Sequence, residues 1–436
     1  MGNSGEMGRT IGVEVLPKKN QSVFKEIAVA HGTPSYVYFR SGLEQNLRRF
    51  LDIPAPFGLT VRYAMKANPT SSILQLFDGM GAHIDASTYN EVVRARAAGI
   101  KGEKIRLTSQ EVQSSEQLDY LKEHNVLYTA CSLRQLDTYG QHAPGEEVGI
   151  RFNIGIGSGW NAQTSTGGEN SSFGIYGRRD EIKSLLQRHD LKLTTVHLHI
   201  GSGSDPDKQK EAIKAGLEIV KQYPDVKALS MGGGFKVARM PGEKETDIAA
   251  MGQAMSQALA EFKQDTGREI KLEVEPGTAL VANAGYILTK IVDVKDTGTE
   301  GKKFLVVNGG MNMNARPALY AAQHPLYVVS QNGVQTDIRD YAVVGINCES
   351  GDLITPQKNE ADRIATRPLL RAEVGDLLVI GGAGAYTSGM ALEHYNSQQA
   401  AREIMVNDDG TFYEVRAQEP VTEIWRHERR LMKLAA

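Results

Sequence analysis

The sequence has only two cysteines, Cys131 and Cys348, among its 436 residues. Two cysteines cannot build the disulfide framework of a small secreted protein, so we expect a reducing compartment. No apolar run is long enough to cross a bilayer, and the first residues contain no apolar signal core. These absences predict a cytoplasmic protein that does not enter a membrane.

The sequence also lacks an excess of positive charge. It has 49 Lys and Arg against 52 Asp and Glu, a formal net charge of −3. Nucleic-acid binding and attachment to an anionic membrane both depend on a basic surface, so neither is expected. The partner should be a small molecule or another protein. A hydrophobic content of 41% and a charged content of 23% are ordinary for a globular enzyme, and the length suits two domains.

The first part of the chain alternates short apolar runs with amphipathic segments. The runs show no strict alternation of polar and apolar residues, which is typical of parallel strands buried on both faces. Eight strand–helix units predict a (β/α)₈ barrel in the α/β class. The eight expected strands are residues 60–66, 83–86, 105–108, 126–129, 148–152, 195–199, 228–231 and 272–274.

The pattern changes after about Ala282. Strand-like segments at 286–294, 303–307, 326–330, 341–344, 377–380 and 411–415 are joined by Gly, Asn and Asp turns, with little helix between them. We therefore expect an N-terminal tail over residues 1–33, a barrel over 34–282 and an antiparallel β-domain over 283–436. The segment Ser35–Phe39 has no place among the eight strands, and it could instead pair within the β-domain.

One lysine stands at the end of the first barrel strand. Residues 61–69 form an apolar run that reaches Lys66 and then breaks at Pro69. An amine at the inner end of a strand would be partly desolvated, which would lower its pKa and make it a nucleophile able to hold a carbonyl as a Schiff base. By itself, Lys66 could equally be a lysine whose head reaches water at a strand end.

Other polar residues also fall at the expected strand ends, where barrel enzymes carry their chemistry. They are Asp85, Arg151, His199 and Glu275, with Gly232, Gly233 and Gly234 directly after the seventh strand. Three glycines expose backbone N–H groups to which a phosphate can bind closely, although they also suit a tight turn. The hydroxyl of Ser202 could join that anion site.

Together these groups predict one ligand, pyridoxal 5'-phosphate. The Lys66 amine would hold its aldehyde, and the His199 imidazole would stack on its ring, unless His199 is a satisfied core residue. Glu275 would be costly to bury unpaired, and a protonated ring nitrogen would relieve that cost. No metal site is expected.

These residues also carry a resemblance to a known family. The segments are YAMKAN at 63–68, HLHIGSG at 197–203, MGGG at 231–234, EPG at 275–277, CESGD at 348–352 and GAY at 384–386. They resemble, in order, the signatures of the alanine-racemase-fold (fold type III, group IV) pyridoxal-phosphate decarboxylases. TGGENS at 166–171, RPALY at 316–320 and YNS at 395–397 resemble the diaminopimelate decarboxylase branch in particular.

The resemblance implies a head-to-tail homodimer with shared active sites, which decarboxylates meso-diaminopimelate to L-lysine in lysine biosynthesis. It assigns cofactor attachment to Lys66 and return of a proton to Cα to Cys348, with Lys66 as the alternative donor. Phosphate binding is implied for Ser202, the three glycines, Gly277 and Tyr386. Substrate binding is implied for Arg316, Tyr320, Glu349 and Tyr386.

The sequence departs from the family pattern at Thr278. The family motif usually reads Glu-Pro-Gly-Arg, and the arginine is expected to bind an anion, either the distal carboxylate of the substrate or the cofactor phosphate. A related decarboxylase for another amino acid, or for a carrier-bound one, is therefore the alternative. A racemase would resemble the family branch with an arginine at the position of Glu275, and a catalytically inactive relative would not need Lys66, His199, Glu275 and Cys348 together.

Overall fold

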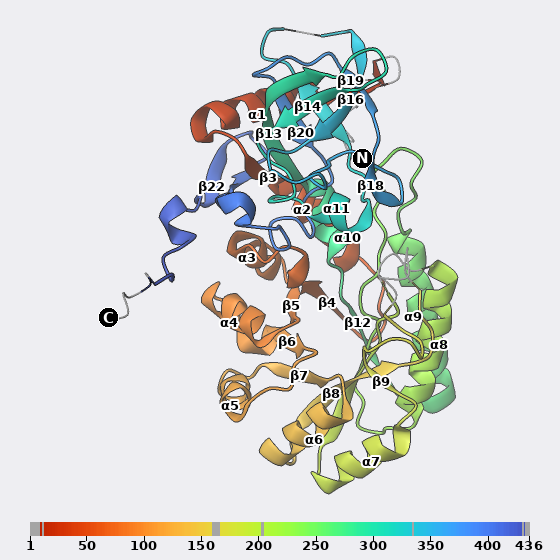
Figure 1. Ribbon diagram of the computed structural model, residues 1–436. Coiled ribbons are helices and arrows are strands. Elements are labelled where there is room, and N and C mark those ends of the chain that lie inside the picture. Colours follow the sequence, from red (N-terminus) through yellow and green to blue (C-terminus); the bar gives the residue numbers. More distant parts are fainter. Residues whose placement is uncertain are drawn as a thin grey trace, which may run out of the picture. The chain divides into compact units, whose positions relative to one another are not determined.

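The computed structural model describes residues 9–10, 13–158, 166–201, 205–333, 335–429 and 431 (Figure 1). The predicted site residue Ser202 lies outside these ranges. The chain divides into two compact units, one formed by residues 42–282 and the other by residues 1–41 together with 283–436. Among the described residues, no helix is both long and apolar enough to cross a membrane.

The unit of residues 42–282 contains a closed barrel of eight parallel strands. Each barrel strand pairs with the next one along the chain, β8 pairs directly with β10, and β12 pairs with β4 to close the barrel. The short added strand β9 (Ile175–Tyr176) pairs with the last two residues of β8. The predicted (β/α)₈ barrel is therefore confirmed. Its strands are β4 (Leu59–Ala64), β5 (His83–Ala86), β6 (Ile105–Thr108), β7 (Leu127–Ala130), β8 (Glu147–Asn153), β10 (Lys192–His197), β11 (Ala228–Ser230) and β12 (Lys271–Val274).

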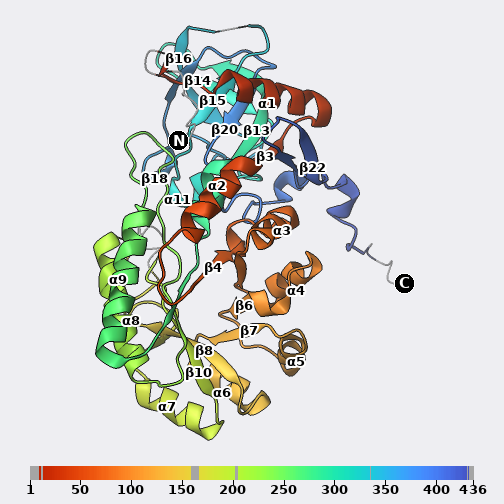
Figure 2. The same ribbon diagram turned by 180° about the vertical axis from the view of Figure 1, so that it is seen from behind.

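Amphipathic helices follow the strands around the outside of the barrel, and α8 and α9 lie side by side in two opposite views (Figures 1 and 2). Several begin at a side-chain cap; for example, Ser114 and Gln117 form a capping box at the start of α5. The helices are α2 (Arg40–Leu51), α3 (Ser71–Gly79), α4 (Tyr89–Ala97), α5 (Ser115–Glu123), α6 (Leu133–His142), α7 (Arg179–Arg188), α8 (Pro206–Lys221), α9 (Ile248–Thr266) and the short α10 (Thr278–Val281).

Three charged side chains lie inside the barrel. Glu273 on β12 accepts hydrogen bonds from Arg62 on β4, with 3.1 Å between Nη2 and Oε1, and from Arg106 on β6. Arg106 also donates to Oγ1 of Thr195 on β10 at 3.2 Å. Burial alone would raise the pKa of Glu273, but Arg106 and Arg62 outweigh it and lower the pKa to about 2. These ion pairs join β12 to its neighbour β4 and to β6, three strands away in the barrel.

Removing this carboxylate should strongly destabilise the barrel. Glu273→Ala leaves two buried guanidinium groups without their counter-charge, so we expect a loss of about 3–5 kcal/mol in the free energy of unfolding by urea. Because folding lowers the pKa from 4.5 to about 2, the contribution should be present above pH 4.5 and lost as the pH falls towards 2. Glu269→Ala, which removes an exposed partner of Lys263, is the control and should cost less than about 1 kcal/mol. Equal stability of the two variants would contradict this account.

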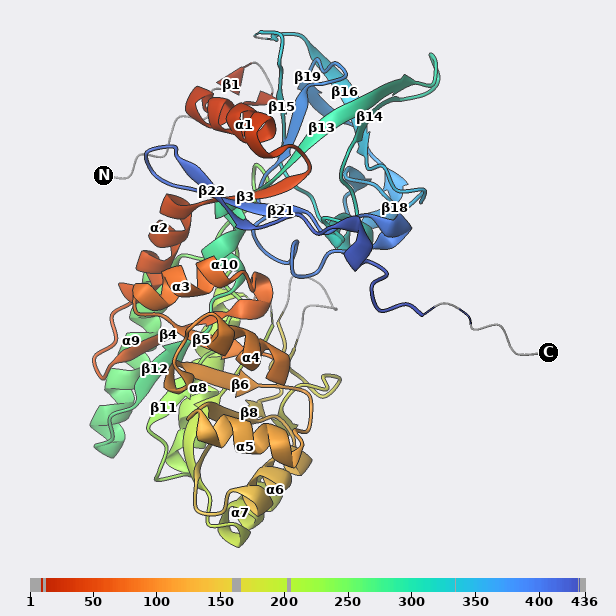
Figure 3. The ribbon, with the colours of Figure 1, turned by 90° about the vertical axis from the view of Figure 1, so that its left-hand side faces the viewer.

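The second unit is built on a mostly antiparallel sheet with strand order β19-β16-β14-β13-β3-β21-β22, in which β20 also pairs with β13 and β15 (Figure 3). The long strand β13 pairs with β14, β20 and β3. Two pairs, β14 with β16 and β3 with β21, are parallel. The strands are β3 (Ser35–Phe39), β13 (Gly285–Asp296), β14 (Lys303–Val307), β15 (Leu326–Val329), β16 (Ile338–Val344), β19 (Arg367–Leu370), β20 (Leu377–Ile380), β21 (Arg402–Val406) and β22 (Phe412–Arg416).

Smaller elements complete this unit. Helix α1 (Lys18–His31) packs on the sheet through Phe24, whose ring lies edge-on to Phe39 and Tyr286 with centroids 5.8 and 5.4 Å away. The others are β1 (Arg9–Thr10), β2 (Val13–Glu14), α11 (Arg316–Tyr320), β17 (Pro356–Gln357) and β18 (Glu360–Ile364).

The strand at residues 35–39 pairs within this sheet and not within the barrel. Strand β3 lies between β13 and β21, so its backbone hydrogen bonds are satisfied there. Strand β3 accordingly belongs to the second unit, and the barrel unit spans residues 42–282, where the sequence suggested 34–282.

Candidate active site

Lys66 lies just beyond the end of its strand. Strand β4 ends at Ala64, and residues Met65–Ala67 form a single 3₁₀ turn, η1. Met65 and Ala67 are buried, but the Lys66 side chain is exposed. Lys66 therefore lies exposed on a turn just past the strand, where the sequence suggested a partly desolvated amine at the strand end itself.

The turn that carries Lys66 packs against the turn that carries Glu275. The Ala64 N–H donates to the Pro276 carbonyl at 3.2 Å. A Cβ atom on Gly277 would lie 3.3 Å from the Cβ atoms of both Ala64 and Ala67, so a larger residue would push the turns apart. This contact sets Lys66 and Glu275 on neighbouring strand ends.

Glu275 is a buried carboxylate with both oxygens hydrogen bonded. His197 Nε2 lies 2.9 Å from Oε2, and the Ser230 hydroxyl donates to Oε1 at 2.8 Å. Burial alone would raise the pKa of Glu275, but the contacts with His197, Ser230 and the nearby Arg106 lower it well below its ordinary value. The carboxylate is therefore held in its ionised form. Strand β12 ends at Val274, the expected last residue of that strand, so Glu275 directly follows it.

Asp85 and Arg151 present buried polar atoms without partners. Asp85 Oδ1 and one Arg151 guanidinium nitrogen make no hydrogen bond within the described part of the chain. Burial and repulsion by Glu275 raise the pKa of Asp85 to about 8, and Lys66 opposes that rise. The Arg151 guanidinium carbon lies 5.0 Å from the centre of the Phe173 ring. Unsatisfied buried groups of this kind indicate that a polar ligand completes the site.

The glycine run after β11 is tightly enclosed. Gly232 has a φ of +66° and Gly234 a φ of +99°. A Cβ atom at Gly232 would lie 2.5 Å from the Leu198 carbonyl oxygen, and one at Gly233 would lie 2.6 Å from that of Glu275. Only glycine fits both positions.

Two of the three glycine amides already have acceptors. The Gly232 N–H donates to Ser230 Oγ at 3.3 Å, and the Gly233 N–H donates to His199 Nδ1 at 3.1 Å. The Gly232 and Gly233 amides are therefore engaged within the protein, and Gly234 is left as the candidate donor for an anion. His199 lies two residues beyond the end of β10, where we expected it to close the strand.

The other predicted residues lie in the second unit. Cys348 and Glu349 are exposed. The Cys348 N–H donates to Asn396 Oδ1 at 2.6 Å, and Glu349 accepts from the Gly351 N–H at 3.1 Å and the Tyr395 hydroxyl at 3.2 Å. Hydrogen bonds with the segment YNS at 395–397 thus fix the position of the segment CESGD at 348–352.

Asp352 anchors the same loop. Its carboxylate accepts from the backbone N–H groups of Met311 and Asn347 at 2.6 and 2.9 Å. Sequence reasoning assigned no role to Asp352 or Asn396. The only available signal was their place inside family-like segments.

Arg316, Tyr320 and Tyr386 come together in this unit. The Arg316 guanidinium carbon lies 5.9 Å from the centre of the Tyr320 ring, and its Nε has no partner among the described residues. Burial lowers the pKa of Arg316, and Tyr386 and Tyr320 face the same guanidinium. Tyr386 has a φ of +55°. A cation beside two phenol groups can bind a carboxylate.

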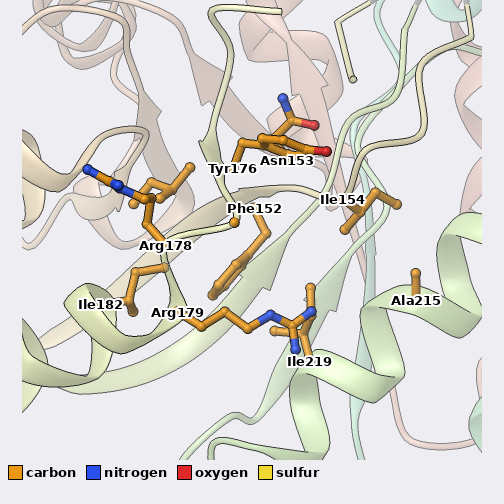
Figure 4. Close-up of a pocket in the computed structure, with 11 residues that line it drawn as sticks. Phe152, Asn153, Ile154, Tyr176, Arg178, Arg179, Ile182, Ala215 and Ile219 are labelled. Atoms are coloured by element: carbon orange, nitrogen blue, oxygen red, sulfur yellow. The ribbon is translucent and has the colours of Figure 1, made fainter. Parts of the chain in front are cut away.

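A cavity of about 230 Å³ lies beside the last residues of strand β8, between β9, α7 and α8 (Figure 4). Figure 4 shows the Phe152 ring among its lining side chains. None of the lining residues is a predicted site residue. They are Phe152, Asn153, Ile154, Ile175, Tyr176, Gly177, Arg178, Arg179, Ile182, Ala215 and Ile219.

The barrel residues fit pyridoxal phosphate. The fit rests on the ionised Glu275, the orphaned polar atoms of Asp85 and Arg151, and the glycine run that excludes any Cβ. Glu275 would suit the ring nitrogen, Asp85 and Arg151 the polar ring substituents, and the glycine run the phosphate.

Comparison with known proteins gives the same result. Residues 43–282 match the family described as "Pyridoxal-dependent decarboxylase, pyridoxal binding domain". A diaminopimelate decarboxylase of Streptomyces coelicolor is 35% identical over 391 residues, which are 87% of this chain and 86% of that protein.

Solved structures agree with these matches. A crystal structure of a diaminopimelate decarboxylase superposes with a TM-score of 0.85 at 30% identity, covering 92% of this chain and 95% of that one. The enzyme from Helicobacter pylori complexed with L-lysine gives a TM-score of 0.81 at 27% identity, covering 93% and 98%. The chain therefore belongs to the pyridoxal-dependent decarboxylases and is an enzyme that uses pyridoxal phosphate to remove a carboxyl group.

Proposed function

We propose that this enzyme decarboxylates meso-diaminopimelate to L-lysine. The observation that carries the reaction type is Glu275, a buried carboxylate kept ionised beside the turn of Lys66. The substrate rests on the similarity over nearly the whole chain to diaminopimelate decarboxylases, one of which binds L-lysine.

Each barrel residue has a separate task in this proposal. The Lys66 amine holds the cofactor, and its exposure leaves it accessible to a substrate amine. The His199 imidazole stacks on the cofactor ring, with Nδ1 fixed by the Gly233 N–H. Asp85 and Arg151 bind the ring substituents. Pyridoxal phosphate supplies the electron sink that accepts the electron pair left when carbon dioxide departs.

The phosphate would be bound by backbone amides and hydroxyl groups. Gly234 has the one amide of the glycine run without an acceptor in the described structure, and Gly277 adds a second close backbone approach. Tyr386 and Ser202 would add hydroxyl groups. Glu275 keeps a proton on the ring nitrogen, because an ionised carboxylate favours the protonated base beside it.

Residues of the second unit would bind and protonate the substrate. Glu349 pairs with the substrate amine, and Arg316 with Tyr320 and Tyr386 binds the distal carboxylate. The Cys348 thiol returns a proton to Cα. Lys66 is the alternative proton donor.

The proposed assembly is a head-to-tail homodimer in the cytoplasm. Cys348 and Glu349 are exposed and belong to a different unit from Lys66, which suits delivery of Cys348 to the barrel of a partner subunit. The active site would then combine the barrel of one protomer with the second unit of its partner.

Thr278 provides a specific test of the substrate. It is half-buried at the start of α10, directly after Gly277. If Arg316 with its two tyrosines binds the distal carboxylate, Thr278→Arg adds a second cation and should lower KM for meso-diaminopimelate by about ten- to a hundredfold, the contribution of one charge-assisted hydrogen bond. The kcat should barely change, because the contact is equal in ground state and transition state.

The measurement compares kcat/KM for meso-diaminopimelate, L-lysine and L-ornithine in wild type and in Thr278→Arg. Thr278→Met, which adds similar length without charge, is the matched control. If wild type rejects diaminopimelate and decarboxylates an amino acid without a distal carboxylate, the enzyme is the related decarboxylase that Thr278 itself suggests.

A further inference from the structure

We infer that His197 and Ser230 are positioning residues that keep Glu275 ionised and correctly oriented towards the cofactor. The inference rests on the role proposed above for Glu275 and extends it to two residues that would not touch the cofactor. His197 is the last residue of β10 and Ser230 the last of β11, and the two lie opposite each other in the register of the sheet. Glu275 follows β12, the next strand.

The geometry assigns the proton positions. An ionised carboxylate can only accept, so the 2.9 Å contact with Oε2 requires a proton on His197 Nε2. Burial lowers the pKa of His197, although Glu275 opposes that effect, so the ring is neutral and carries one proton. His197 Nδ1 is then a bare nitrogen, and it has no partner within the described ranges. The single hydrogen bond of this buried imidazole is therefore directed at Glu275.

Ser230 works from the other oxygen. Its hydroxyl donates to Glu275 Oε1 at 2.8 Å and accepts from the Gly232 N–H at 3.3 Å. The hydroxyl proton of Ser230 therefore points at the Glu275 carboxylate, because a lone pair of the same oxygen already accepts the Gly232 N–H. The Ser230 side chain therefore links Glu275, the proposed partner of the cofactor ring nitrogen, to the glycine run proposed to bind the cofactor phosphate.

The hydrogen bonds to the Glu275 carboxylate come from His197 and Ser230, and the other charged groups nearby do not replace them. Arg106 also favours the ionised form of Glu275, but its hydrogen bonds go to Glu273 and Thr195. Asp85 and Glu273 are acidic neighbours, and Cys131 carries a neutral thiol because burial raises its pKa to about 12. The titratable and charged groups that face Glu275 are Asp85, Arg106, Cys131, Arg151, His197, His199 and Glu273.

The test is cofactor binding by the apoprotein at several pH values. His197→Leu removes the donor, so the pKa of Glu275 should rise, and the carboxylate should be lost as the pH falls through that raised pKa. We expect Kd for pyridoxal phosphate to rise about tenfold near neutral pH and further towards about pH 5, whereas wild type stays flat over this range. His197→Gln keeps an N–H donor and should stay within about threefold of wild type.

Two further variants make the result decisive. His189→Leu removes another histidine that contacts a carboxylate, Asp137 at 2.7 Å, and should leave cofactor affinity unchanged. Ser230→Ala removes the second donor with little change in volume, and it decides the matter if His197→Leu fails to fold by circular dichroism. Wild-type affinity and a flat pH profile in both His197→Leu and Ser230→Ala would overturn the inference. Failure of wild type itself to bind the cofactor would instead overturn the proposed function.

Discussion

Replacing Lys66 by alanine should lower kcat by about a thousandfold or more, because the variant loses both the amine that holds the cofactor and a potential proton carrier. Lys66 is exposed on the turn after β4 and faces Asp85, Glu91 and His199 electrostatically, so its amine lies among the groups proposed to hold the cofactor. The readouts are steady-state decarboxylation and borohydride reduction followed by peptide mass mapping. In wild type, reduction should fix the cofactor on the peptide that contains Lys66.

A surface lysine of the same barrel separates this effect from a general loss of charge. Lys192 is exposed at the first position of β10, the opposite end of the strand from His197. Lys192→Ala should keep wild-type activity and the reducible cofactor. Near-normal turnover in Lys66→Ala, or cofactor fixed on another lysine in wild type, would refute the assignment.

Replacing Cys348 by alanine should lower kcat by about 10²- to 10⁴-fold, the usual worth of a positioned acid. If the thiol acts in the partner's active site, mixing Lys66→Ala with Cys348→Ala subunits should restore activity. Random exchange makes about half of the dimers mixed, each with one intact site of two, so recovery should approach about a quarter of wild-type activity.

The matched control is a mixture of Lys66→Ala with Glu275→Gln. Both substitutions lie in the barrel unit, so each site of the mixed dimer keeps one defect and no activity should return. Native mass spectrometry can verify subunit exchange in both mixtures. Exchange without rescue in the first mixture would exclude a site shared between subunits.

The barrel was predictable because its strands are buried on both faces. β5 and β6 have the bounds that their apolar runs indicate, and the remaining strands shift by a few residues at their ends. Helices α3 and α6 follow the first and fourth barrel strands, as eight strand–helix units require. The pairing of β3 with β13 and β21 joins segments far apart in the chain. Local sequence patterns could therefore suggest this pairing only as a possibility.

Part of the candidate site depended on geometry that the sequence does not contain. A polar residue at a strand end can be identified as a candidate, as with Asp85 and Glu275. The roles of His197 and Ser230 depend on which strands are neighbours and on their register. The engagement of the Gly232 and Gly233 amides depends on where Ser230 and His199 point, and the exposure of Lys66 depends on one 3₁₀ turn.

The most direct test of the proposed function is to incubate the purified enzyme with meso-diaminopimelate and measure carbon dioxide and L-lysine together, with and without added pyridoxal phosphate. The proposed function predicts that both products appear in equal amounts and that activity falls when the cofactor is removed and returns when it is restored. Absence of both products from the cofactor-loaded enzyme would contradict it, as would carbon dioxide release without lysine.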